Sequence, residues 1–491
     1  MDLTALTQWT RSGPMLVPAL GMLVVAGCLA LRAVPGDTLR RGACVADGKR
    51  AQRNARRRAR RFGDPPLTLA GVLIPARDET KHFKLIGTTG TGKSTAIAGL
   101  LAVALRRGDR AVIADPDGGY LARFYQRRRG DVILNPFEPH SVKWDPFAEI
   151  NVRWDVDQLS SGLIPSTEDP SGREWRGYAR TFLTAVTRRC HERGERDPHE
   201  LWRLLTIATS TELRPIVAGT PAQPFLEPEN ARMFGSIRSV AVSAIAALEH
   251  VQAQRARAFS VRAWVRRGNG VLFIPYRAAQ IAALRSIIAT WMRLAIFEAM
   301  SEPEGDLRLW FVVDELDSLG AIDGLKDALA RLRKFGGRCV LGFQSIAQVS
   351  ATYGSGEAQT IVENCGNTLI LRCAGSEHGG TSQFASRLIG QREVMRTTLS
   401  RSRRPYEILP SITRSENPSV ETAVMGSQIE QLPDLAGYLK LASNPYWMRV
   451  ALRRPEVTRA MSGSVVPVAT LKRHQPVAAH EAARTHDGLG L

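Results

Sequence analysis

The sequence predicts an α/β fold built on a mostly parallel, twisted sheet, with an inserted all-α domain and one N-terminal transmembrane helix. Three observations lead to this fold class. A phosphate-binding loop, Gly87–Ser94, stands between a short apolar run and a helical one. Apolar runs and helical runs alternate on both sides of this loop, which is the pattern of a parallel sheet covered by helices. Near the N-terminus, the uncharged run Gly13–Leu31 is long enough to cross a bilayer.

Residues 1–31 are predicted to be a membrane anchor, with the span at about residues 13–31. Many arginines follow this run, so the positive-inside rule places the C-terminal side in the cytoplasm. The alternative is a cleaved signal, because Val25–Cys28 resembles a lipoprotein cleavage box. Export would separate a nucleotide site from cytoplasmic ATP, and this favours the anchor.

Residues 32–66 are predicted to be a basic juxtamembrane linker. Its arginine cluster has three interpretations: contact with anionic lipid, at about 1 kcal/mol per basic residue, contact with DNA phosphates, and a solvated charge run. The whole chain of 491 residues has 66 Lys and Arg against 47 Asp and Glu, a formal net charge of +19. Such a balance is typical of proteins that contact polyanions, although an ordinary basic protein has it too.

The phosphate-binding loop has the form G-x-x-x-x-G-K-[ST], and each position has a chemical reason. Glycines let the backbone curl so that successive N–H groups face a phosphate. Lys93 reaches the β- and γ-phosphates, the Ser94 hydroxyl is placed to bind Mg²⁺, and the following helix adds its positive N-terminal end. The residues assigned to ATP binding are Gly87, Thr88, Thr89, Gly90, Thr91, Gly92, Lys93, Ser94 and Thr95.

The elements around this loop assign residues 67–150 to the first part of a nucleotide-binding domain. Phe83–Ile86 is predicted to be the strand before the loop, and Ser94–Arg107 the helix after it. Further predicted strands are Leu67–Ile74, Ala111–Asp115 and Asp131–Asn135.

From residue 151 to residue 267 the pattern changes, and no convincing strand is found. Apolar and aromatic residues recur at helical spacing between Trp175 and Val186 and again between Ile237 and Val251. Asp197 followed by proline is typical of a helix start. The segment is predicted to be an inserted all-α domain whose aromatic residues form an ordinary core.

Residues 268–454 return to the α/β pattern and are assigned to the second part of the nucleotide-binding domain. The predicted strands are Val271–Ile274, Leu309–Val313, Cys339–Phe343 and Thr368–Leu371, and the predicted helices are Ala278–Met300 and Leu325–Phe335. Arg396–Asn417 is polar and basic and is predicted to be a mobile loop. Residues 455–491 lack periodicity and are predicted to be a disordered tail.

Two strand ends complete the predicted ATP site, because a phosphate loop also needs a carboxylate for Mg²⁺ and a group that orients water. Asp314 and Glu315 follow an apolar run, at the carboxyl end where parallel sheets bind ligands. Asp314 is assigned to Mg²⁺ through water and Glu315 to the base that activates water; the alternative is a surface pair. Gln344 ends the next strand, where it either senses the γ-phosphate or caps the strand.

Other metal chemistry is not indicated by the sequence. The six cysteines show no C-x-x-C pair, which is typical of reduced thiols in a cytosolic body. The two His-Glu pairs, at His191 and His199, lack the second histidine of a zinc motif. We therefore assign no zinc.

Several stretches, in order, resemble the type IV secretion coupling proteins of bacterial conjugation, of the TraD/TrwB type. They are HFKLIGTTGTGKST (82–95), DPDGG (115–119), NPFEPHSVKWDPFAEI (135–150), VVDELDSLGAIDGLKDALARLRKFGGR (312–338), GFQS (342–345) and QIEQLPDLAGYLKL (428–441). The resemblance runs from about residue 67 to residue 454. It implies a RecA-like P-loop ATPase with an all-α insertion, anchored in a membrane and hexameric, that delivers DNA to a secretion channel.

The resemblance also carries roles to single residues. The residues that match the two nucleotide motifs and the following glutamine are Lys93, Ser94, Asp314, Glu315 and Gln344. Arg333 lies where the family places an arginine finger, which would neutralise charge on a neighbouring subunit's phosphate. The alternative for Arg333 is a cation at a helix C-terminus. One departure is that the family usually has two membrane helices, whereas this sequence shows one clear span.

The leading functional prediction is an ATP-driven DNA pump in the bacterial inner membrane, with the bulk of the chain in the cytoplasm. Six subunits would surround a channel that holds DNA phosphates without reading bases, so binding would not be sequence-specific. The implied partners are the type IV secretion channel and the relaxosome proteins. One alternative is a chromosome translocase of the FtsK kind, although the residues after 455 are too few for its DNA-reading domain. Another is an adaptor that recruits protein substrates through the helical domain.

Overall fold

The structure, a computed structural model, describes residues 37–62, 66–167, 169–301, 303–305, 307–376, 379–402 and 411–454. The predicted membrane span and the predicted tail lie outside these residues. The described residues form two compact units. One consists of the residues up to 45 together with 386–425, and the other of residues 46–385 together with those from 426 onward.

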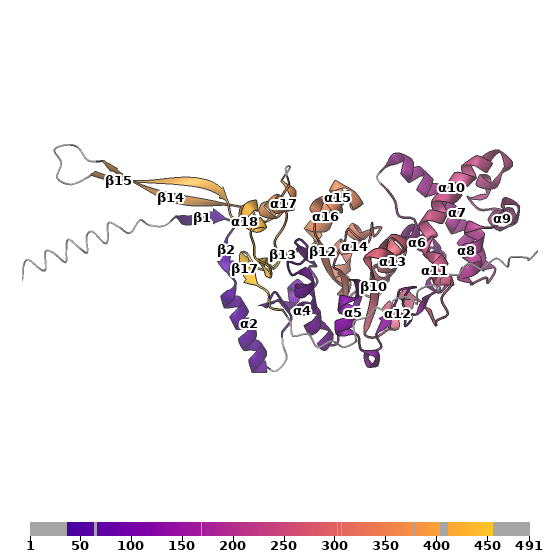
Figure 1. Ribbon diagram of the computed structural model, residues 1–491, viewed down its shortest axis with the longest axis horizontal. Coiled ribbons are helices and arrows are strands. Elements are labelled where there is room, and N and C mark those ends of the chain that lie inside the picture. The colour runs from indigo at the N-terminus through magenta and orange to yellow at the C-terminus, as the bar shows by residue number, and fades with distance from the viewer. Residues whose placement is uncertain are drawn as a thin grey trace, which may run out of the picture. The chain divides into compact units, whose positions relative to one another are not determined.

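The larger unit is built on a ten-stranded sheet, in the order β2-β17-β16-β13-β5-β12-β11-β6-β10-β7 (Figure 1). Its strands in that order are β2 (Val45–Asp47), β17 (Trp447–Ala451), β16 (Ala436–Lys440), β13 (Asn367–Ile370), β5 (Phe83–Ile86), β12 (Arg338–Phe343), β11 (Leu309–Val313), β6 (Arg110–Pro116), β10 (Val271–Tyr276) and β7 (Val132–Ile133). The strands from β13 to β7 are parallel, and β16 and β17 continue the sheet antiparallel. The predicted α/β fold with a mostly parallel sheet is therefore confirmed.

The central strands are mostly apolar because helices cover both of their faces, although β5 contains Lys84 and β12 begins with Arg338. Every residue of β5, β11, β12 and β10 is buried. The helices that alternate with these strands or follow them are α4 (Lys93–Arg106), α5 (Gly119–Phe124), α12 (Val261–Arg267), α13 (Ala278–Ala299), α14 (Leu325–Leu332), α15 (Ile346–Tyr353), α16 (Ser355–Asn364), α17 (Gly380–Ile389) and α18 (Gly426–Glu430). Of the helices in the described residues, α13 alone is long and apolar enough to cross a membrane, but most of it is buried inside the protein. We interpret α13 as a core helix.

One predicted strand, Leu67–Ile74, is wrong. It is a small hairpin of β3 (Thr68–Leu69) and β4 (Val72–Leu73). Ala70 and Gly71 between them have φ values of 50° and 73°. Two successive residues with positive φ form the tight turn that suits a two-residue hairpin. The residues around this turn are mostly apolar, so hydrophobic periodicity alone does not reveal it.

Helices dominate residues 151–267. They are α6 (Asp155–Leu163), α7 (Pro170–Glu192), α8 (Pro198–Thr206), α9 (Ser210–Val217), α10 (Ala231–Ile245) and α11 (Ala247–Gln252), with short 3₁₀ turns at Gln223–Leu226 and Pro228–Asn230. Figure 1 shows α7 to α10 gathered beyond the β10 side of the sheet. Asp197 caps α8 by accepting a hydrogen bond from the His199 N–H. The expectation of no strand fails in one place, because β9 (Ala258–Phe259) pairs with β8 (Lys143–Trp144).

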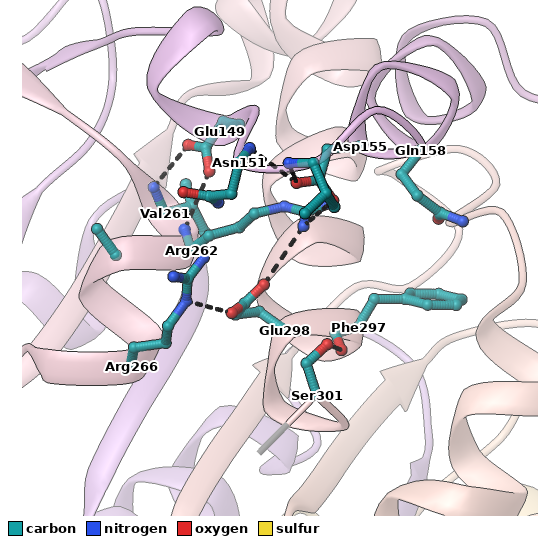
Figure 2. A network of polar contacts seen from close by, with 12 residues as sticks. Glu149, Asn151, Asp155, Gln158, Val261, Arg262, Arg266, Phe297, Glu298 and Ser301 are labelled. Atoms are coloured by element: carbon teal, nitrogen blue, oxygen red, sulfur yellow. Dashed lines mark hydrogen bonds and ion pairs between the residues drawn. The ribbon is translucent and has the colours of Figure 1, made fainter.

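A buried ionic network fixes the start of α6 to the body (Figure 2). Arg262 on α12 donates to Asp155 on α6 at 2.5 Å and lies 3.4 Å from Glu298 on α13. Arg266 also pairs with Glu298. Glu149 accepts hydrogen bonds from the N–H groups of Val261 and Arg262, which caps the start of α12. The helical segment is therefore joined to the sheet through paired buried charges rather than through apolar contact alone.

The smaller unit overturns one prediction, the mobile loop at Arg396–Asn417. β14 (Gln391–Ser402) and β15 (Ser411–Thr422) pair along their length as an antiparallel hairpin, and β1 (Thr38–Gly42) adds a third strand. Residues 403–410, at its tip, lie outside the described residues. The strands carry polar residues on both faces, so they lack the alternation that marks a half-buried strand. Cross-strand ion pairs from Arg392 and Arg396 to Glu421 support the pairing instead.

The predicted linker, residues 32–66, is also largely structured where it is described. It contains β1, β2 and a fourteen-residue helix, α2 (Lys49–Phe62). The Gln52 side chain, which is 4% exposed, donates to the carbonyls of Ala70 and Ala451. The arginines of α2 were the basis for predicting a basic linker, but a buried face of small residues and one amide attaches the helix to the larger unit.

Candidate nucleotide site

Strand order brings the predicted nucleotide motifs together. β5, β12 and β11 are adjacent and parallel, so their carboxyl ends lie at one edge of the sheet. The phosphate loop follows β5, Asp314 follows β11 and Gln344 follows β12. Residues that are about 220 to 255 positions apart in the chain are consequently in hydrogen-bond contact at this edge.

The phosphate loop has the backbone that its glycines predict. Gly90 and Gly92 have φ values of 78° and 118°, and α4 begins at the next residue. A Cβ atom added to Gly87 would lie 2.9 Å from the Leu371 Cβ, and one added to Gly92 would lie 2.9 Å from a Leu435 methyl. The loop is therefore a tightly held cradle whose N–H groups, with the start of α4, suit a phosphate.

Lys93 lies at the base of this cradle. Its Nζ donates to the Gly87 carbonyl at 2.5 Å and is 3.3 Å from the Thr88 carbonyl. Burial lowers the pKa of Lys93, while the nearby carboxylates of Asp314 and Glu315 oppose that shift. A partly desolvated ammonium group beside a ring of N–H groups is well placed to meet phosphate oxygens.

Asp314 is held by two hydroxyl groups on the same oxygen. Ser94 Oγ donates to Asp314 Oδ2 at 2.5 Å, and the Tyr120 hydroxyl donates to it at 2.8 Å. The other oxygen, Oδ1, is buried and has no hydrogen-bond partner among the residues that the structure describes. A buried carboxylate with an unsatisfied oxygen, next to a serine hydroxyl, provides the hard oxygen ligands that Mg²⁺ prefers. The residues present therefore fit Mg²⁺.

Tyr120 was not identified from the sequence. It follows the turn after β6, where Gly118 has a φ of 68°. Asp115 accepts hydrogen bonds from the N–H groups of Tyr120 and Leu121 and so fixes the start of α5. Burial raises the pKa of Asp115 to about 7. The only sequence signal was the Asp-Pro-Asp-Gly-Gly turn, and only the adjacency of β6 and β11 shows that an aromatic residue after it reaches Asp314.

Glu315 and the phosphate loop are bridged by Gln344. The Gln344 amide donates from Nε2 to Glu315 Oε1 at 2.9 Å, and its Oε1 accepts from the Thr89 hydroxyl at 2.9 Å. Burial raises the pKa of Glu315, the carboxylates of Asp314 and Asp317 raise it further, and the Gln344 hydrogen bond opposes them. A half-buried carboxylate with a raised pKa, oriented by an amide, is suited to accept a proton from water.

Arg333 is the one predicted site residue that the structure does not bring to this edge. It lies in a 3₁₀ turn, Arg333–Phe335, directly after α14, and is exposed. Burial lowers the pKa of His82 to about 4, and the charge of Arg333 acts in the same direction. His82 precedes β5, whereas the phosphate loop follows it, so Arg333 lies near the amino edge of the sheet and away from its own chain's loop.

Comparison with known proteins relates the chain to the coupling proteins of type IV secretion systems. Residues 66–453 match the family model described as the type IV secretion-system coupling protein DNA-binding domain. The coupling protein TraD of Escherichia coli (strain K12) is 29% identical over 407 residues, which cover 80% of this chain and 56% of TraD. The chain thus spans little more than half the length of that relative.

Solved structures of the conjugative coupling protein TrwB are similar in fold. TrwBΔN70 in an unbound form is 31% identical with a TM-score of 0.77, and the match covers 88% of this chain and 97% of that one. TrwB in complex with the ATP analogue ADPNP is 30% identical with a TM-score of 0.76, covering 88% and 98%. TrwB in complex with ADP and Mg²⁺ is 30% identical with a TM-score of 0.75, covering 87% and 96%.

Proposed function

The chain belongs to the type IV secretion-system coupling protein family, and we propose that it is a membrane-anchored hexameric ATPase that pumps DNA during conjugation. Family membership makes it a homologue of conjugative coupling proteins with a DNA-binding domain. Hydrolysis, the hexamer, the membrane anchor and the pumping of DNA are parts of the proposal. The observation that carries it is the convergence of Lys93, Asp314 and Glu315 at one sheet edge.

ATP and Mg²⁺ are the cofactors that this edge suits. The loop of residues 87–95 would hold the phosphates, and Ser94 and Asp314 would hold Mg²⁺. When bound, Mg²⁺ neutralises charge on the phosphate oxygens. Lys93 adds a point charge on the same side, and Tyr120 keeps Asp314 turned toward Ser94.

Glu315 and Gln344 are assigned to the water that attacks the γ-phosphate. Glu315 would take the proton of that water, since its raised pKa keeps it a stronger base than an exposed carboxylate. Gln344 contacts both Glu315 and Thr89 of the loop. Gln344 can therefore transmit a change in the phosphate loop, such as the loss of the γ-phosphate, to Glu315.

Arg333 is assigned to a neighbouring subunit's site. Its place near the amino edge, away from its own loop, gives it no role in its own chain's phosphate chemistry. In a ring of subunits, an exposed guanidinium at that edge can meet the next subunit's nucleotide, which supports a hexamer whose activity needs assembly.

DNA is the proposed cargo, with the secretion channel and relaxosome proteins as partners. The +19 net charge supports contact with DNA phosphates without base reading. The adaptor alternative, in which the helical segment recruits protein substrates, predicts ATPase activity that DNA leaves unchanged.

The deciding experiment is the ATPase rate of the full chain in detergent, with and without DNA, beside Lys93→Ala as the inactive control. We expect clear stimulation by DNA in the wild type and no turnover in the variant. Turnover by Lys93→Ala would overturn the ATPase assignment. Turnover that DNA does not change would favour the adaptor.

A further inference from the structure

Helix α2 has a continuous basic surface that the proposed ATPase cycle does not use. Its sequence, KRAQRNARRRARRF, contains eight basic residues and no acidic one, and all eight are exposed. At about 100° per residue, seven of them fall within an arc of roughly 140°. These seven, called here the basic face of α2, are Lys49, Arg50, Arg53, Arg56, Arg57, Arg60 and Arg61.

The opposite side of α2 attaches the helix to the larger unit, so the basic face has a set direction. Gln52 is buried, and its amide donates to the Ala70 carbonyl at 2.7 Å and to the Ala451 carbonyl at 2.8 Å. Ala55 is 5% exposed on the same side. The Gly48 N–H, just before the helix, donates to the Arg449 carbonyl at 2.9 Å. These contacts prevent the helix from rolling, and they turn the arginines outward.

The charge pattern of α2 is unfavourable for the helix by itself. Arg53 and Arg57 are four positions apart, and so are Arg56 and Arg60. Like charges at this spacing lie on the same face and destabilise a helix. A polyanionic surface against the basic face would remove this repulsion, so the pattern indicates a docking surface for anions.

Position in the chain favours a membrane over DNA as that polyanion. Lys49 follows Leu31, the last residue of the predicted span, by eighteen positions, and such a length of chain reaches at most about 60 Å. α2 also follows β2, an edge strand, whereas the helical segment follows the opposite edge strand, β7. A tether of this length keeps the basic face at high effective concentration beside the bilayer, while DNA must first be recruited.

We propose that the basic face of α2 binds the anionic headgroups of the cytoplasmic leaflet and thereby sets the orientation of the larger unit on the membrane. This inference rests on the proposed membrane location. It adds a second contact to the predicted span, because one anchored point alone leaves the body free to rotate. The contact is electrostatic, since the apolar side of α2 faces the protein and not the lipid.

The test is hydrogen exchange of the α2 amides in the full chain reconstituted into nanodiscs. One set contains phosphatidylcholine alone, and the other contains phosphatidylcholine with phosphatidylglycerol. We expect the α2 amides to exchange at least about fivefold more slowly in the anionic discs, the effect of one lipid-paired basic residue. Amides of α8 serve as an internal reference that should not change.

Two variants with the same loss of charge sharpen this test. The first carries Arg53→Gln, Arg56→Gln, Arg57→Gln and Arg60→Gln, which retain helix propensity. The matched control carries Arg106→Gln, Arg127→Gln, Arg128→Gln and Arg257→Gln, at exposed positions outside α2. The first should lose the lipid-dependent slowing and keep its ATPase rate, and the control should keep both.

Each other outcome contradicts the inference. Equal exchange in both kinds of disc would overturn it. Slowing in neutral discs on addition of duplex DNA, without any effect of phosphatidylglycerol, would assign the basic face to DNA instead. A full chain that does not remain with neutral discs would overturn the membrane location and this inference together. A chain that remains but shows no slowing would overturn only the inference.

Discussion

At the scale of single residues, Tyr120 and Ser94 both donate to one oxygen of Asp314, and the other oxygen has no partner among the described residues. The Tyr120 hydroxyl also interacts with the Ser94 side chain. Its effect on a bound ion would therefore act through the orientation of Asp314 and Ser94. Residues that orient a metal ligand commonly matter about 10–100-fold for metal affinity or activity.

Tyr120→Phe tests this role. We expect the Mg²⁺ concentration needed for half-maximal ATPase to rise about 10–100-fold, because Asp314 loses a donor that fixes its orientation. Mg²⁺ titrations of the ATPase rate provide the measurement. Tyr353→Phe is the matched control, since that buried hydroxyl accepts from the Ile322 N–H and donates to the Gly320 carbonyl, both backbone groups. An unchanged Mg²⁺ requirement in Tyr120→Phe would contradict the role.

Glu315→Gln should bind ATP normally and hydrolyse it about 10²–10⁴-fold more slowly, because an amide cannot accept the proton of water. Burial raises the pKa of Glu315 above the usual range of a glutamate, and a base works only when it is deprotonated. The wild-type rate should consequently fall as pH falls through this raised pKa, so the acid limb should begin at a higher pH than an exposed glutamate would give. Single-turnover rates across pH measure both effects. Loss of nucleotide binding in the variant would show that Glu315 has another role.

At the scale of elements, β2 and α2, which precede the phosphate loop in the chain, are part of the folded body. β2 is an edge strand of the sheet, and Gln52 of α2 satisfies the carbonyls of Ala70 and Ala451. A hydrogen bond of this kind contributes about 0.5–1.5 kcal/mol net to stability. The folded body therefore begins before β2, nearer the N-terminus than the composition suggests.

Two truncations distinguish these boundaries. Deletion of residues 1–36 should leave the larger unit as stable as in the full chain. Deletion of residues 1–62 should lower its free energy of unfolding by about 1–3 kcal/mol, because the two hydrogen bonds from Gln52 are lost. Urea unfolding of both proteins under the same conditions gives the comparison. Equal stability of the two truncations would mean that α2 adds nothing to the fold.

At the scale of the whole molecule, the proposed arginine finger, Arg333, would have to act on the nucleotide of a neighbouring subunit. Arg333 lies near His82, which precedes β5, whereas the phosphate loop follows β5. Arg333 and the phosphate loop of the same chain are therefore separated by about the length of that strand, roughly 13 Å. A finger that acts on its own chain's phosphate would have to lie at the carboxyl edge. Activity of the assembly should thus exceed that of isolated subunits.

Mixing two inactive variants tests action between subunits. Arg333→Ala should bind ATP and lose about 10³-fold or more in turnover, as removal of an arginine finger does. Mixed with Lys93→Ala, it should regain part of the activity, because some interfaces then join an intact loop to an intact arginine. ATPase rates of oligomers verified as mixed provide the measurement. Activity no higher than that of either parent would count against the finger, and full activity in a verified monomer would exclude it.

The local motifs of the site could be predicted from the sequence because each is contiguous in the chain. Gly90 and Gly92 are required by positive φ, and the apolar runs before Asp314 and Gln344 mark strands buried on both faces. The family and the mostly parallel sheet follow from such runs and from motif order, and both are confirmed. These features depend on residues close in sequence, whose preferences do not need the rest of the fold.

Only the tertiary structure decided which strands are neighbours and which polar segments pair. The β14–β15 hairpin has no apolar alternation, so its register depends on partners across the hairpin. The composition of α2 indicates only a run of charge, because its attachment to the body depends on hydrogen bonds from Gln52 to the distant carbonyls of Ala70 and Ala451. Tyr120 reaches Asp314 because β6 lies beside β11, and Arg333 is at the opposite edge because α14 leads back to the start of β12. The physical reason is common to all four: sheet order and buried polar pairing are set by contacts between residues far apart in the chain, which local composition does not encode.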